Sequence, residues 1–391
     1  MAAGDILHIL YVVHDLSDPA VRRRTTMLKA GGANVSLAGF RRTAAPVASI
    51  EGIVPIDLGV TRDGRFDQRL LAVARASLAA KRLFGKVHEP DVIIARNLEM
   101  LTIARRAKSA LGWAAPVVYE CLDIHRLVLR DDIVGSALRA SERALGRGVS
   151  LLMTSSPAFV ANYFARFGQV SAPIELVENR FLELGKGYTV AGPLAADRPW
   201  RIGWFGALRC RKSLELLAAF TRQHAGRYEV VLRGRPALSE FPDFHGFVDA
   251  EPYLSFEGEY RNPEDIARIY GDVHFAWAID FFEEGQNSKW LLPNRLYEGC
   301  RFAAVPITMA GTETSKLARE RGVGLELRDA SVVAMTEALD AVDATSYGAM
   351  KQRLLAGGPA TWSYGLADCR ALVGKLAALA SPHRRPLAAA S

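Results

Sequence analysis

Residues 6–13 (ILHILYVV) and 34–39 (NVSLAG) have the apolar composition of buried strands, and a helix-like stretch joins them. That stretch begins at Asp18-Pro19, where the aspartate can cap a helix and the proline suits its first position. It ends at Gly31-Gly32, which is typical of a helix C-terminus. A strand, a helix and a second strand within about 35 residues make a βαβ unit. This unit predicts parallel strands with helices packed on the sheet.

The same alternation of strands and helices continues along the chain in two series. The first series runs to residue 177 and includes a long helix at residues 69–84, and the second begins with a strand at residues 200–205. The length of 391 residues fits two domains, because a domain usually has roughly 100–200 residues. We therefore expect an α/β protein of two similar halves, each a parallel sheet covered on both faces.

The expected domain boundaries lie where this alternation fails. Residues 1–182 form the first domain, residues 183–199 a linker and residues 200–362 the second domain. A C-terminal helix at 363–380 can pack back on the first domain, and the tail at 381–391 is expected to be disordered. Parallel sheets bind ligands at the carboxyl ends of their strands, so two such domains facing each other predict a site in the cleft between them.

The composition is that of a folded globular protein, with 50% hydrophobic and 23% charged residues. No apolar run approaches the roughly 18–20 residues that cross a bilayer, and the N-terminal residues lack the pattern of a signal peptide. The four cysteines are far apart in the sequence, which indicates free thiols in a reducing cytosol rather than a metal or redox pair. These features predict a cytoplasmic protein without a membrane-spanning helix.

The positive charge is concentrated in the first half of the chain. Residues 1–185 carry 24 Lys and Arg against 18 Asp and Glu, whereas the rest of the chain carries 25 against 24. This asymmetry suggests that the first half meets a polyanion, which is a nucleic acid, an anionic membrane surface or a phosphorylated substrate. The alternative is uneven scatter in an arginine-rich protein.

The strongest local signal in the second half is residues 292–299 (LPNRLYEG), which begin a helix with a carboxylate one to two turns from its start. Glu298 can accept hydrogen bonds from ribose hydroxyls, and the free amides at the helix start can bind a diphosphate. Asn287 and Ser288 lie just upstream in a polar loop. The alternative is an acid that only complements the helix dipole.

A second signal is residues 206–212 (GALRCRK), between the predicted strand 200–205 and a helix. Gly206 at the end of that strand allows a ligand to approach the backbone closely. Arg209, Arg211 and Lys212 follow it and can neutralise phosphates. The alternative is an exposed basic turn.

Three features of the first half are candidates for acceptor chemistry. His14 and Asp15 follow the first strand, and Asp123 and His125 follow a later buried strand, where an acid and an imidazole can act as a general base. The alternative is that these histidines are structural. The run Arg22, Arg23 and Arg24 lies on one helix and is either a solvated face or a contact for phosphates and lipid headgroups.

Several common motifs are absent from the sequence. There is no GxGxxG at the first strand, no GxxxxGK[ST], no GxSxG and no HExxH. These absences disfavour a classical dehydrogenase, a P-loop NTPase, a serine hydrolase and a zincin protease, respectively. No DNA-binding signature accompanies the basic half, so no nucleic-acid partner is expected.

With these residues in view, the chain resembles the GT-B glycosyltransferases over essentially its whole length. Residues 10–19 (LYVVHDLSDP) and the Arg22–Arg24 run are similar to bacterial exopolysaccharide glycosyltransferases of the succinoglycan-assembly type. Residues 204–206 (WFG) and 287–298 (NSKWLLPNRLYE) strengthen the resemblance, which extends more distantly to the retaining family 4. The resemblance implies two facing Rossmann-like domains that use a nucleotide-sugar donor.

The resemblance also implies roles for residues that match the family's motifs. Glu298 matches the second glutamate of a paired-glutamate motif, which binds the donor ribose. The basic positions after the glycine turn contact the diphosphate, and the polar loop and helix start hold donor sugar and phosphate. His125 lies near the histidine that contacts the donor sugar. The implied donor-binding residues are Gly206, Arg209, Arg211, Lys212, Asn287, Ser288, Asn294 and Glu298.

One position departs from the family 4 pattern. The first glutamate of the pair is expected eight positions before Glu298, where this chain has Trp290, and Glu283 and Glu284 lie further upstream. Both a retaining and an inverting reaction therefore remain open. An inverting reaction needs a base on the acceptor side, and the candidates, in order, are Asp123, His14 and Asp15. No metal or other cofactor is expected.

The predicted function is sugar transfer from a nucleotide diphosphate donor, UDP-sugar in our prediction, to a saccharide linked to polyprenyl diphosphate. The basic first half then predicts a peripheral protein on the anionic cytoplasmic surface of the inner membrane, with Arg22, Arg23 and Arg24 among the contacts. The alternatives are a GT-B nucleotide-sugar epimerase and a catalytically inactive α/β partner protein.

Overall fold

The computed structural model describes residues 6–62, 66–185, 187–190, 194 and 199–380. The chain divides into two compact units, which are residues 1–177 with 365–391 (unit 1) and residues 178–364 (unit 2). The first division lies five residues before the expected boundary at 182, and unit 2 includes residues of the expected linker. The expected tail at 381–391 and linker positions 186, 191–193 and 195–198 lie outside the described residues.

Unit 1 is built on a parallel sheet whose described strands have the order β3-β2-β1-β4-β5-β6-β7. The strands are β1 (His8–Val13), β2 (Asn34–Arg41), β3 (Ile56–Val60), β4 (Val92–Arg96), β5 (Val117–Cys121), β6 (Leu151–Thr154) and β7 (Ile174–Leu176). β1, β4 and β5 are almost completely buried, because helices cover both faces of the sheet. The predicted parallel α/β architecture is therefore present in this unit.

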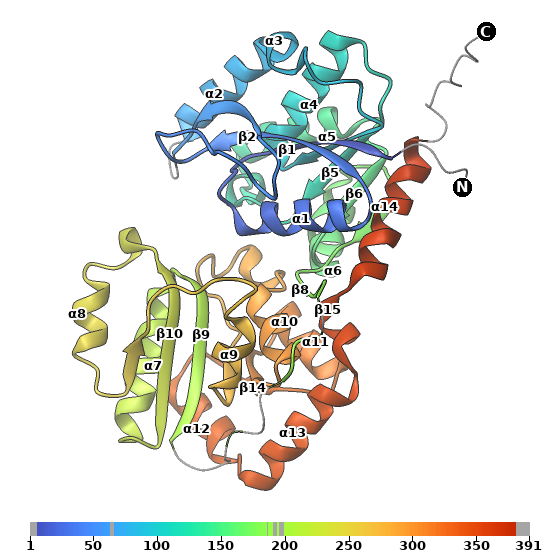
Figure 1. Cartoon of the computed structure of the whole chain (residues 1–391). Helices are drawn as coiled ribbons and strands as arrows, with labels where there is room; N and C mark the ends of the chain where they lie inside the picture. The colour runs from blue at the N-terminus through green and yellow to red at the C-terminus, as the bar shows by residue number, and fades with distance from the viewer. Residues whose placement is uncertain (1–5, 63–65, 186, 191–193, 195–198, 381–391) are drawn as a thin grey trace. The chain divides into compact units, whose positions relative to one another are not determined.

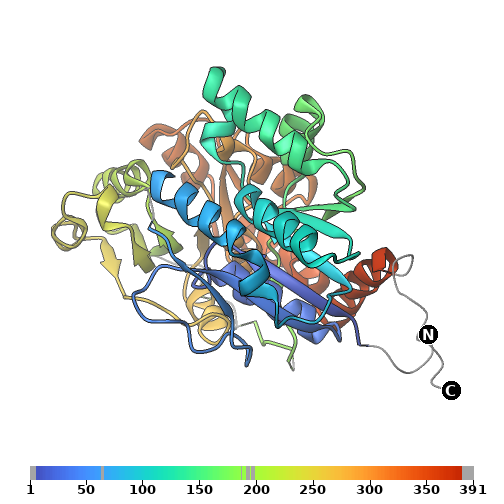
Figure 2. The ribbon, with the colours of Figure 1, turned by 90° about the horizontal axis from the view of Figure 1, so that it is seen from above.

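Helices cover the two faces of the unit 1 sheet (Figure 1). α1 (Pro19–Ala30) and α14 (Leu366–Ala380) pack against each other on one face. The other face carries α2 (Phe66–Leu78), α3 (Ala80–Phe84), α4 (Leu98–Leu111) and α5 (Ile133–Gly146). Figure 2 looks onto this second face. Short helical segments complete the unit: η1 (Arg126–Leu129), α6 (Pro157–Phe159) and the π-helical η2 (Val160–Ala165).

The sequence signals at the ends of α1 act as predicted. The side chain of Asp18 accepts a hydrogen bond from the amide of Ala20, and Pro19 occupies the first helical position. At the other end Gly31 lies so close to Cys369 of α14 that a Cβ at Gly31 would be 2.4 Å from the Cys369 carbonyl oxygen. The glycine therefore ends the helix and also lets α14 approach it.

Unit 2 repeats the same strand order, β11-β10-β9-β12-β13-β14, in a second parallel sheet. Its strands are β9 (Trp200–Leu208), β10 (Tyr228–Pro236), β11 (Leu254–Phe256), β12 (Phe275–Trp277), β13 (Val305–Met309) and β14 (Leu325–Leu327). Its helices are α7 (Arg211–Gln223), α8 (Phe244–Asp249), α9 (Ile266–Gly271), α10 (Asn294–Arg301), α11 (Glu313–Glu320), α12 (Val332–Asp340) and α13 (Ala344–Ala356). The turns η3 (Leu238–Glu240), η4 (Asn287–Lys289) and η5 (Pro359–Thr361) are 3₁₀ helices.

The core of unit 2 lies on both sides of its sheet. Ile202 and Trp204 of β9 belong to the larger apolar cluster, whereas Phe205 belongs to a second cluster with residues of α9. Neighbouring side chains of a strand point to opposite faces, so this alternation places helices on both faces of the sheet.

The position of Gly206 differs from the prediction. β9 does not end before Gly206 but continues to Leu208, because its ladder with β10 continues to Pro236. Gly206 pairs with Gly234, and both have positive φ values, of 111° and 123°. A Cβ at Gly234 would lie 2.0 Å from the Gly206 carbonyl oxygen, so this pair of strands requires glycine there.

A short parallel ribbon ties together the two segments at which the chain enters and leaves unit 2. β8 (Phe181–Leu182) pairs with β15 (Ser363–Tyr364), and the amide of Glu178 donates to the Tyr364 hydroxyl at 3.0 Å. The expected linker begins next to it at Glu183, whose carboxylate accepts two hydrogen bonds from buried Arg301. This start of the expected linker is thus held by the second unit. No helix in the described part of the chain is long and apolar enough to cross a membrane.

Candidate functional site

Both sheets have a topological switch point, where the strand order reverses and α/β folds bind ligands. In unit 1 this point lies between β1 and β4, and the loops that follow hold His14, Asp15 and Asn97. In unit 2 it lies between β9 and β12, and the loops that follow hold Arg209 and Asp280. The predicted site residues are therefore concentrated at the ligand-binding ends of the two sheets.

The buried centre of the unit 1 site is Glu120, the fourth residue of β5. Its side chain is fully buried and accepts hydrogen bonds from Arg24 Nε at 2.6 Å and from the Tyr11 hydroxyl at 2.5 Å. Arg96 donates to the Tyr11 hydroxyl and to Asp18, both at 3.1 Å. Burial opposes ionisation, but the cations of Arg24 and Arg96 outweigh it and hold the pKa of Glu120 below its usual value.

This network positions His14 at the end of β1. The Nδ1 atom of His14 lies 3.3 Å from the Asn97 side-chain nitrogen, and its Nε2 atom lies 4.0 Å from an Asp18 carboxylate oxygen. Burial, with a smaller effect of the Arg96 cation, lowers the pKa of His14 below its usual value. His14 is therefore neutral at pH 7 and has a nitrogen directed at a carboxylate, which are properties of a general base.

Asp15 has a different environment. One carboxylate oxygen accepts hydrogen bonds from the amide and hydroxyl of Ser17, and the other accepts from Arg42 Nε at 3.1 Å. These contacts outweigh the effect of burial and lower the pKa of Asp15. A carboxylate held in this way is a weak proton acceptor, so Asp15 fits a structural role in the loop.

Asp123 and His125 follow β5, and both side chains are exposed. The His125 Nδ1 atom accepts a hydrogen bond from the Leu127 amide and caps the turn η1. Burial of part of the ring lowers the pKa of His125, and Glu99 raises it slightly. Glu99 also acts on His14 through its charge. The structure thus brings both predicted histidines to the neighbourhood of one carboxylate.

The three consecutive arginines of α1 have three different environments. Arg22 is exposed and pairs with Glu51 at 2.6 Å, and Arg23 is half-buried. Arg24 points inward to Glu120 and is 4% exposed. The prediction that Arg24 contacts phosphates or lipid headgroups is wrong, because its charge is already paired inside the fold.

The centre of the unit 2 site is Asp280, which lies between two arginines. One of its carboxylate oxygens is 3.5 Å from Arg209 and 3.4 Å from Arg295. Arg295 also donates to the Ile279 carbonyl at 2.6 Å, but its buried Nε has no hydrogen-bond partner in the described structure. Two cations that share one carboxylate retain the capacity to bind an anion such as a phosphate.

The other two predicted cations have separate partners. Lys212 forms a salt bridge with Glu284 at 2.7 Å and lies over the ring of Phe281. Arg211 pairs with Glu215 one turn further along α7 and is exposed. Arg209 and Lys212 thus both contact the loop after β12, whereas Arg211 pairs with a residue of its own helix.

Glu298 lies on α10 and is buried. One carboxylate oxygen accepts from the Asn262 side chain at 2.9 Å, and the other lies 3.4 Å from the Tyr270 hydroxyl. The hydroxyl of Tyr260 is near both Gly206 and Glu298: a Cβ at Gly206 would lie 3.8 Å from it, and its pKa is raised by burial and by the Glu298 charge. The structure therefore brings Gly206 and Glu298 to the same region of unit 2.

The loop between β12 and α10 is also ordered by local contacts. Asn287 and Ser288 form the buried turn η4, and the Ser288 hydroxyl donates to the Glu283 carbonyl at 2.7 Å. Asn294 is the exposed first residue of α10. Trp290, which replaces the expected glutamate, is half-buried after η4. In the described part of the chain, no three His, Cys, Asp or Glu side chains gather as metal ligands would.

Sequence similarity identifies the family of this chain. Over 379 residues it is 56% identical to the succinoglycan biosynthesis protein ExoL of Rhizobium meliloti (strain 1021), and the match covers 96% of this chain and 94% of that protein. The chain belongs to the ExoL family. No protein-family model matches it.

Solved structures show that this ExoL-family chain has the GT-B fold. HepE of Anabaena, solved with UDP and glucose, has a TM-score of 0.66 at 13% identity and covers 94% of this chain and 98% of its own. Sucrose-phosphate synthase of Thermosynechococcus elongatus has a TM-score of 0.64 at 16% identity, covering 96% and 97%. The lipopolysaccharide outer core galactosyltransferase WaaB has a TM-score of 0.59 at 12% identity, covering 89% and 94%. The predicted fold class is confirmed.

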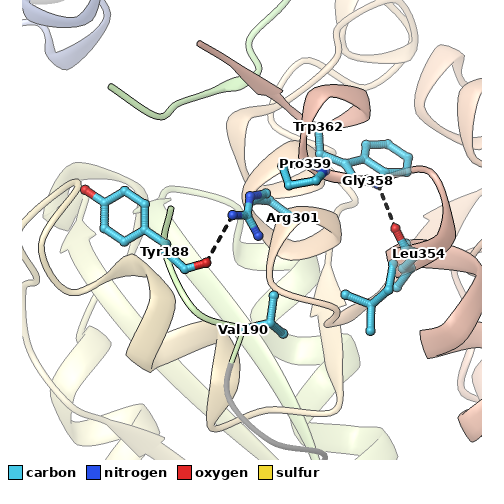
Figure 3. Close-up of a pocket in the computed structure, with 8 residues that line it drawn as sticks. Tyr188, Val190, Arg301, Leu354, Gly358, Pro359 and Trp362 are labelled. Atoms are coloured by element: carbon cyan, nitrogen blue, oxygen red, sulfur yellow. Dashed lines mark hydrogen bonds between the residues drawn. The ribbon is translucent and has the colours of Figure 1, made fainter. Parts of the chain in front are cut away.

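Two hollows in the described part of unit 2 lie away from the predicted residues of this ExoL-family chain. One, of about 180 Å³, is lined by Val190, Arg301 and Trp362, with Trp362 Nε1 donating to the Leu354 carbonyl at 3.3 Å (Figure 3). The other, of about 270 Å³, lies beside α11 and β14. Neither hollow contains a predicted donor-binding residue. The candidate donor site of unit 2 is therefore assigned from the residues at the switch point.

Several residues of the ExoL-family site are not among those predicted from the sequence. They are the charged and phenolic partners of the predicted groups: Tyr11, Arg96, Tyr260, Asn262, Asp280 and Arg295. Two of these residues stand out in the sequence pattern. Arg96 is a charged residue at the end of a buried apolar strand, and Arg295 is a charged residue in the first turn of α10. A charge in such a position needs a partner, which the sequence alone does not name.

Proposed function

We propose that this chain is a glycosyltransferase of succinoglycan-type exopolysaccharide assembly that uses a UDP-sugar donor. The observation that carries the proposal is the unit 2 switch point of a GT-B fold, where Arg209 after β9 and Arg295 of α10 share the carboxylate of Asp280 after β12. Membership of the ExoL family supports the pathway.

Each part of the donor has a matching group in unit 2. Arg209 and Arg295 are cations for the diphosphate, and a bound diphosphate would replace Asp280 as their shared anion. Glu298 keeps lone pairs beyond those used by Asn262 and Tyr270, and these accept the ribose hydroxyls. HepE was solved with UDP and glucose and with UDP-glucose, which supports the choice of uracil as the base.

The acceptor in this proposal is a saccharide on polyprenyl diphosphate, and His14 is the base. The acceptor hydroxyl oxygen forms a bond to the anomeric carbon of the donor sugar, and the bond from that carbon to the UDP oxygen breaks. The acceptor proton passes to the neutral imidazole of His14. The negative charge that develops on UDP is balanced by Arg209 and Arg295, so the proposal includes no metal ion.

His14 fits this role better than Asp15, because Asp15 is occupied by Ser17 and Arg42. Asp123 is the competing base. The proposed place of action is the cytoplasmic surface of the inner membrane, where the acceptor lipid would lie, and the protein would bind there as a peripheral protein.

A thermal-shift screen tests the donor. UDP, GDP, ADP and TDP are each added to the full chain, and the nucleotide that binds the native state raises its melting temperature. We expect stabilisation by UDP above the other three. Equal stabilisation by all four would reject the choice of uracil, and no stabilisation by any would reject the nucleotide site itself.

The second candidate function is a catalytically inactive partner protein, which is favoured by Trp290 at the position of the expected glutamate. A transferase consumes UDP-sugar only slowly by hydrolysis and rapidly once a lipid-linked acceptor is added. An inactive partner binds UDP but consumes no donor in either condition, and a GT-B epimerase releases an epimerised sugar without any acceptor. Donor consumption followed with and without acceptor separates the three.

A further inference from the structure

Residues 68–88 contain five basic residues and no aspartate or glutamate. The basic residues are Arg69, Arg75, Lys81, Arg82 and Lys86. The stretch forms most of α2 and all of α3, on the face of the unit 1 sheet shown in Figure 2. Part of the positive charge of the first half of the chain therefore lies on these two helices, in addition to the basic residues of α1.

The outward side of α2 and α3 also carries large apolar side chains. Leu71 is 58% exposed and Leu78 is 81% exposed, while Val73, Ala76 and Phe84 are buried. We call the outward side the α2–α3 face; it consists of Leu70, Leu71, Arg75, Leu78, Lys81 and Arg82. Leu71 and Leu78 lie two helical turns apart, and their joint exposure is not explained by packing within the fold.

The cations of this face differ from five of the arginines of unit 1. Arg22, Arg24, Arg41, Arg42 and Arg96 each form an ion pair with a carboxylate. Among the residues that the structure describes, no carboxylate lies within ion-pair distance of Arg75, Lys81 or Arg82. Exposed cations can bind the anionic headgroups of a membrane, and the exposed leucines beside them can enter its apolar interior.

We propose that the α2–α3 face docks on an anionic lipid bilayer, with the leucines entering the acyl boundary and the cations contacting the headgroups. This proposal extends the proposed function, because it places the acceptor half against the lipid that carries the acceptor. A lipid surface fits better than a nucleic acid, since Leu71 and Leu78 are apolar groups without the aromatic rings that stack on bases.

The opposite face of the same unit supplies a matched control. Leu366 and Arg370 of α14 are exposed and four residues apart, as are Leu71 with Arg75 and Leu78 with Arg82. α14 packs on α1, on the other side of the sheet from α2, and it has Asp368 in its first turn. A leucine and an arginine can thus be changed in the same way on either face.

The experiment is vesicle co-sedimentation of the full chain. The vesicles are phosphatidylcholine with or without phosphatidylglycerol, at low and at high salt. The variants are Leu71→Ser with Arg75→Glu, Leu78→Ser with Arg82→Glu, and the control Leu366→Ser with Arg370→Glu. We expect the wild type to bind only the anionic vesicles and to release them at high salt.

Each α2–α3 variant should bind about thirtyfold more weakly than the wild type, and the control less than about threefold more weakly. Equal losses in all three variants would show that net charge alone matters and would overturn the proposal. Binding by both α2–α3 variants at the wild-type level would overturn it as well. Retention of the wild-type protein by RNA but not by anionic vesicles would also reject it.

UDP binding separates this proposal from the proposed function. Each variant is tested for its melting temperature and for stabilisation by UDP, since the donor residues are in unit 2. Folded variants that keep the UDP response but lose vesicle binding support the docking face. If the wild type binds vesicles but no nucleotide, the docking proposal stands and the proposed function fails.

Discussion

The Arg24 guanidinium and the Glu120 carboxylate form a buried ion pair, with Nε 2.6 Å from Oε1, between positions 96 residues apart in the sequence. The pair ties α1 to β5 at the carboxyl end of the unit 1 sheet. The loop that holds His14 and Asp15 joins β1 to α1, so fixing α1 in place also fixes this loop. The geometry of the proposed acceptor site thus depends on a contact deep in the fold.

Replacement of Glu120 by Gln should destabilise unit 1 by about 3–5 kcal/mol, because it leaves the buried Arg24 without its counter-charge and Arg96 with Asp18 alone. Hydrogen exchange of the β1 and β5 amides measures this effect within the unit. We expect faster exchange of these amides while UDP stabilisation of the protein is retained.

The control for Glu120 is Glu51→Gln, which removes the partner of Arg22. Arg22 is 62% exposed, and exposed pairs contribute only about 0–1 kcal/mol. If Glu120→Gln changed the exchange rates no more than Glu51→Gln, the buried pair would not be what holds α1 in place.

Arg209 and Arg211 are two residues apart but should differ strongly in donor binding. Arg209 shares Asp280 with Arg295, whereas Arg211 pairs with Glu215 on its own helix. Arg209→Ala should weaken UDP binding about tenfold or more, since it removes a charge-assisted contact to the diphosphate. Arg211→Ala should change it less than about threefold. Calorimetric titration with UDP measures both, and equal losses would contradict the arrangement.

Glu298→Gln should reduce the discrimination between UDP and 2′-deoxy-UDP. In the proposed site the Glu298 carboxylate accepts ribose hydroxyls, so the wild type should prefer UDP by about tenfold. The amide of the variant is uncharged and should lower that preference, while the affinity for 2′-deoxy-UDP changes little.

Glu313→Gln is the control variant for Glu298→Gln. Glu313 is an acid in the first turn of α11 and pairs with Lys316, so this variant should keep the full preference for the ribose. A Glu298→Gln variant that discriminates like the wild type would place the ribose elsewhere.

The pH dependence of the reaction should report on His14. Burial and the Arg96 cation lower its pKa below the usual 6.5, and the Asp18 charge opposes them. The base is active when neutral, so activity should be lost only as the pH falls below 6.5. Asp18→Asn keeps a good helix cap but removes the charge, and it should shift this loss to still lower pH.

NMR titration of the His14 imidazole measures the same pKa directly. His14→Asn should abolish sugar transfer while UDP binding persists. His125→Asn is the control variant, and its rate of sugar transfer is compared with that of His14→Asn. An Asp18→Asn profile that moves to higher pH, or full transfer by His14→Asn, would leave Asp123 as the base.

The fold could be predicted from the sequence because its signals are local. The Asp18-Pro19 start and the Gly31 stop bound α1, and the apolar runs mark the buried strands. The errors also have local causes. Gly206 resembles a strand end but lies inside β9, and the predicted helix at 69–84 is interrupted at Ala79 between α2 and α3.

The site could be predicted only in part, because its contacts depend on which strands and loops become neighbours. Glu298 was found from its place on a helix, but its partners Asn262 and Tyr270 lie 36 and 28 residues away. Arg24 was assigned to the surface because its neighbours in the sequence are basic. Its inward direction follows from helical geometry combined with the buried acid on β5.

The packing of α14 on α1 has a consequence for synthesis. Unit 2 is a single continuous stretch of chain, but unit 1 contains α14, which is the last described helix of the protein. During translation the chain emerges N-terminus first, so the close approach of Gly31 to Cys369 cannot form until α14 has left the ribosome. The unit that begins first is therefore completed only after unit 2 has been translated, and a nascent chain would expose the side of α1 that α14 covers until α14 has emerged.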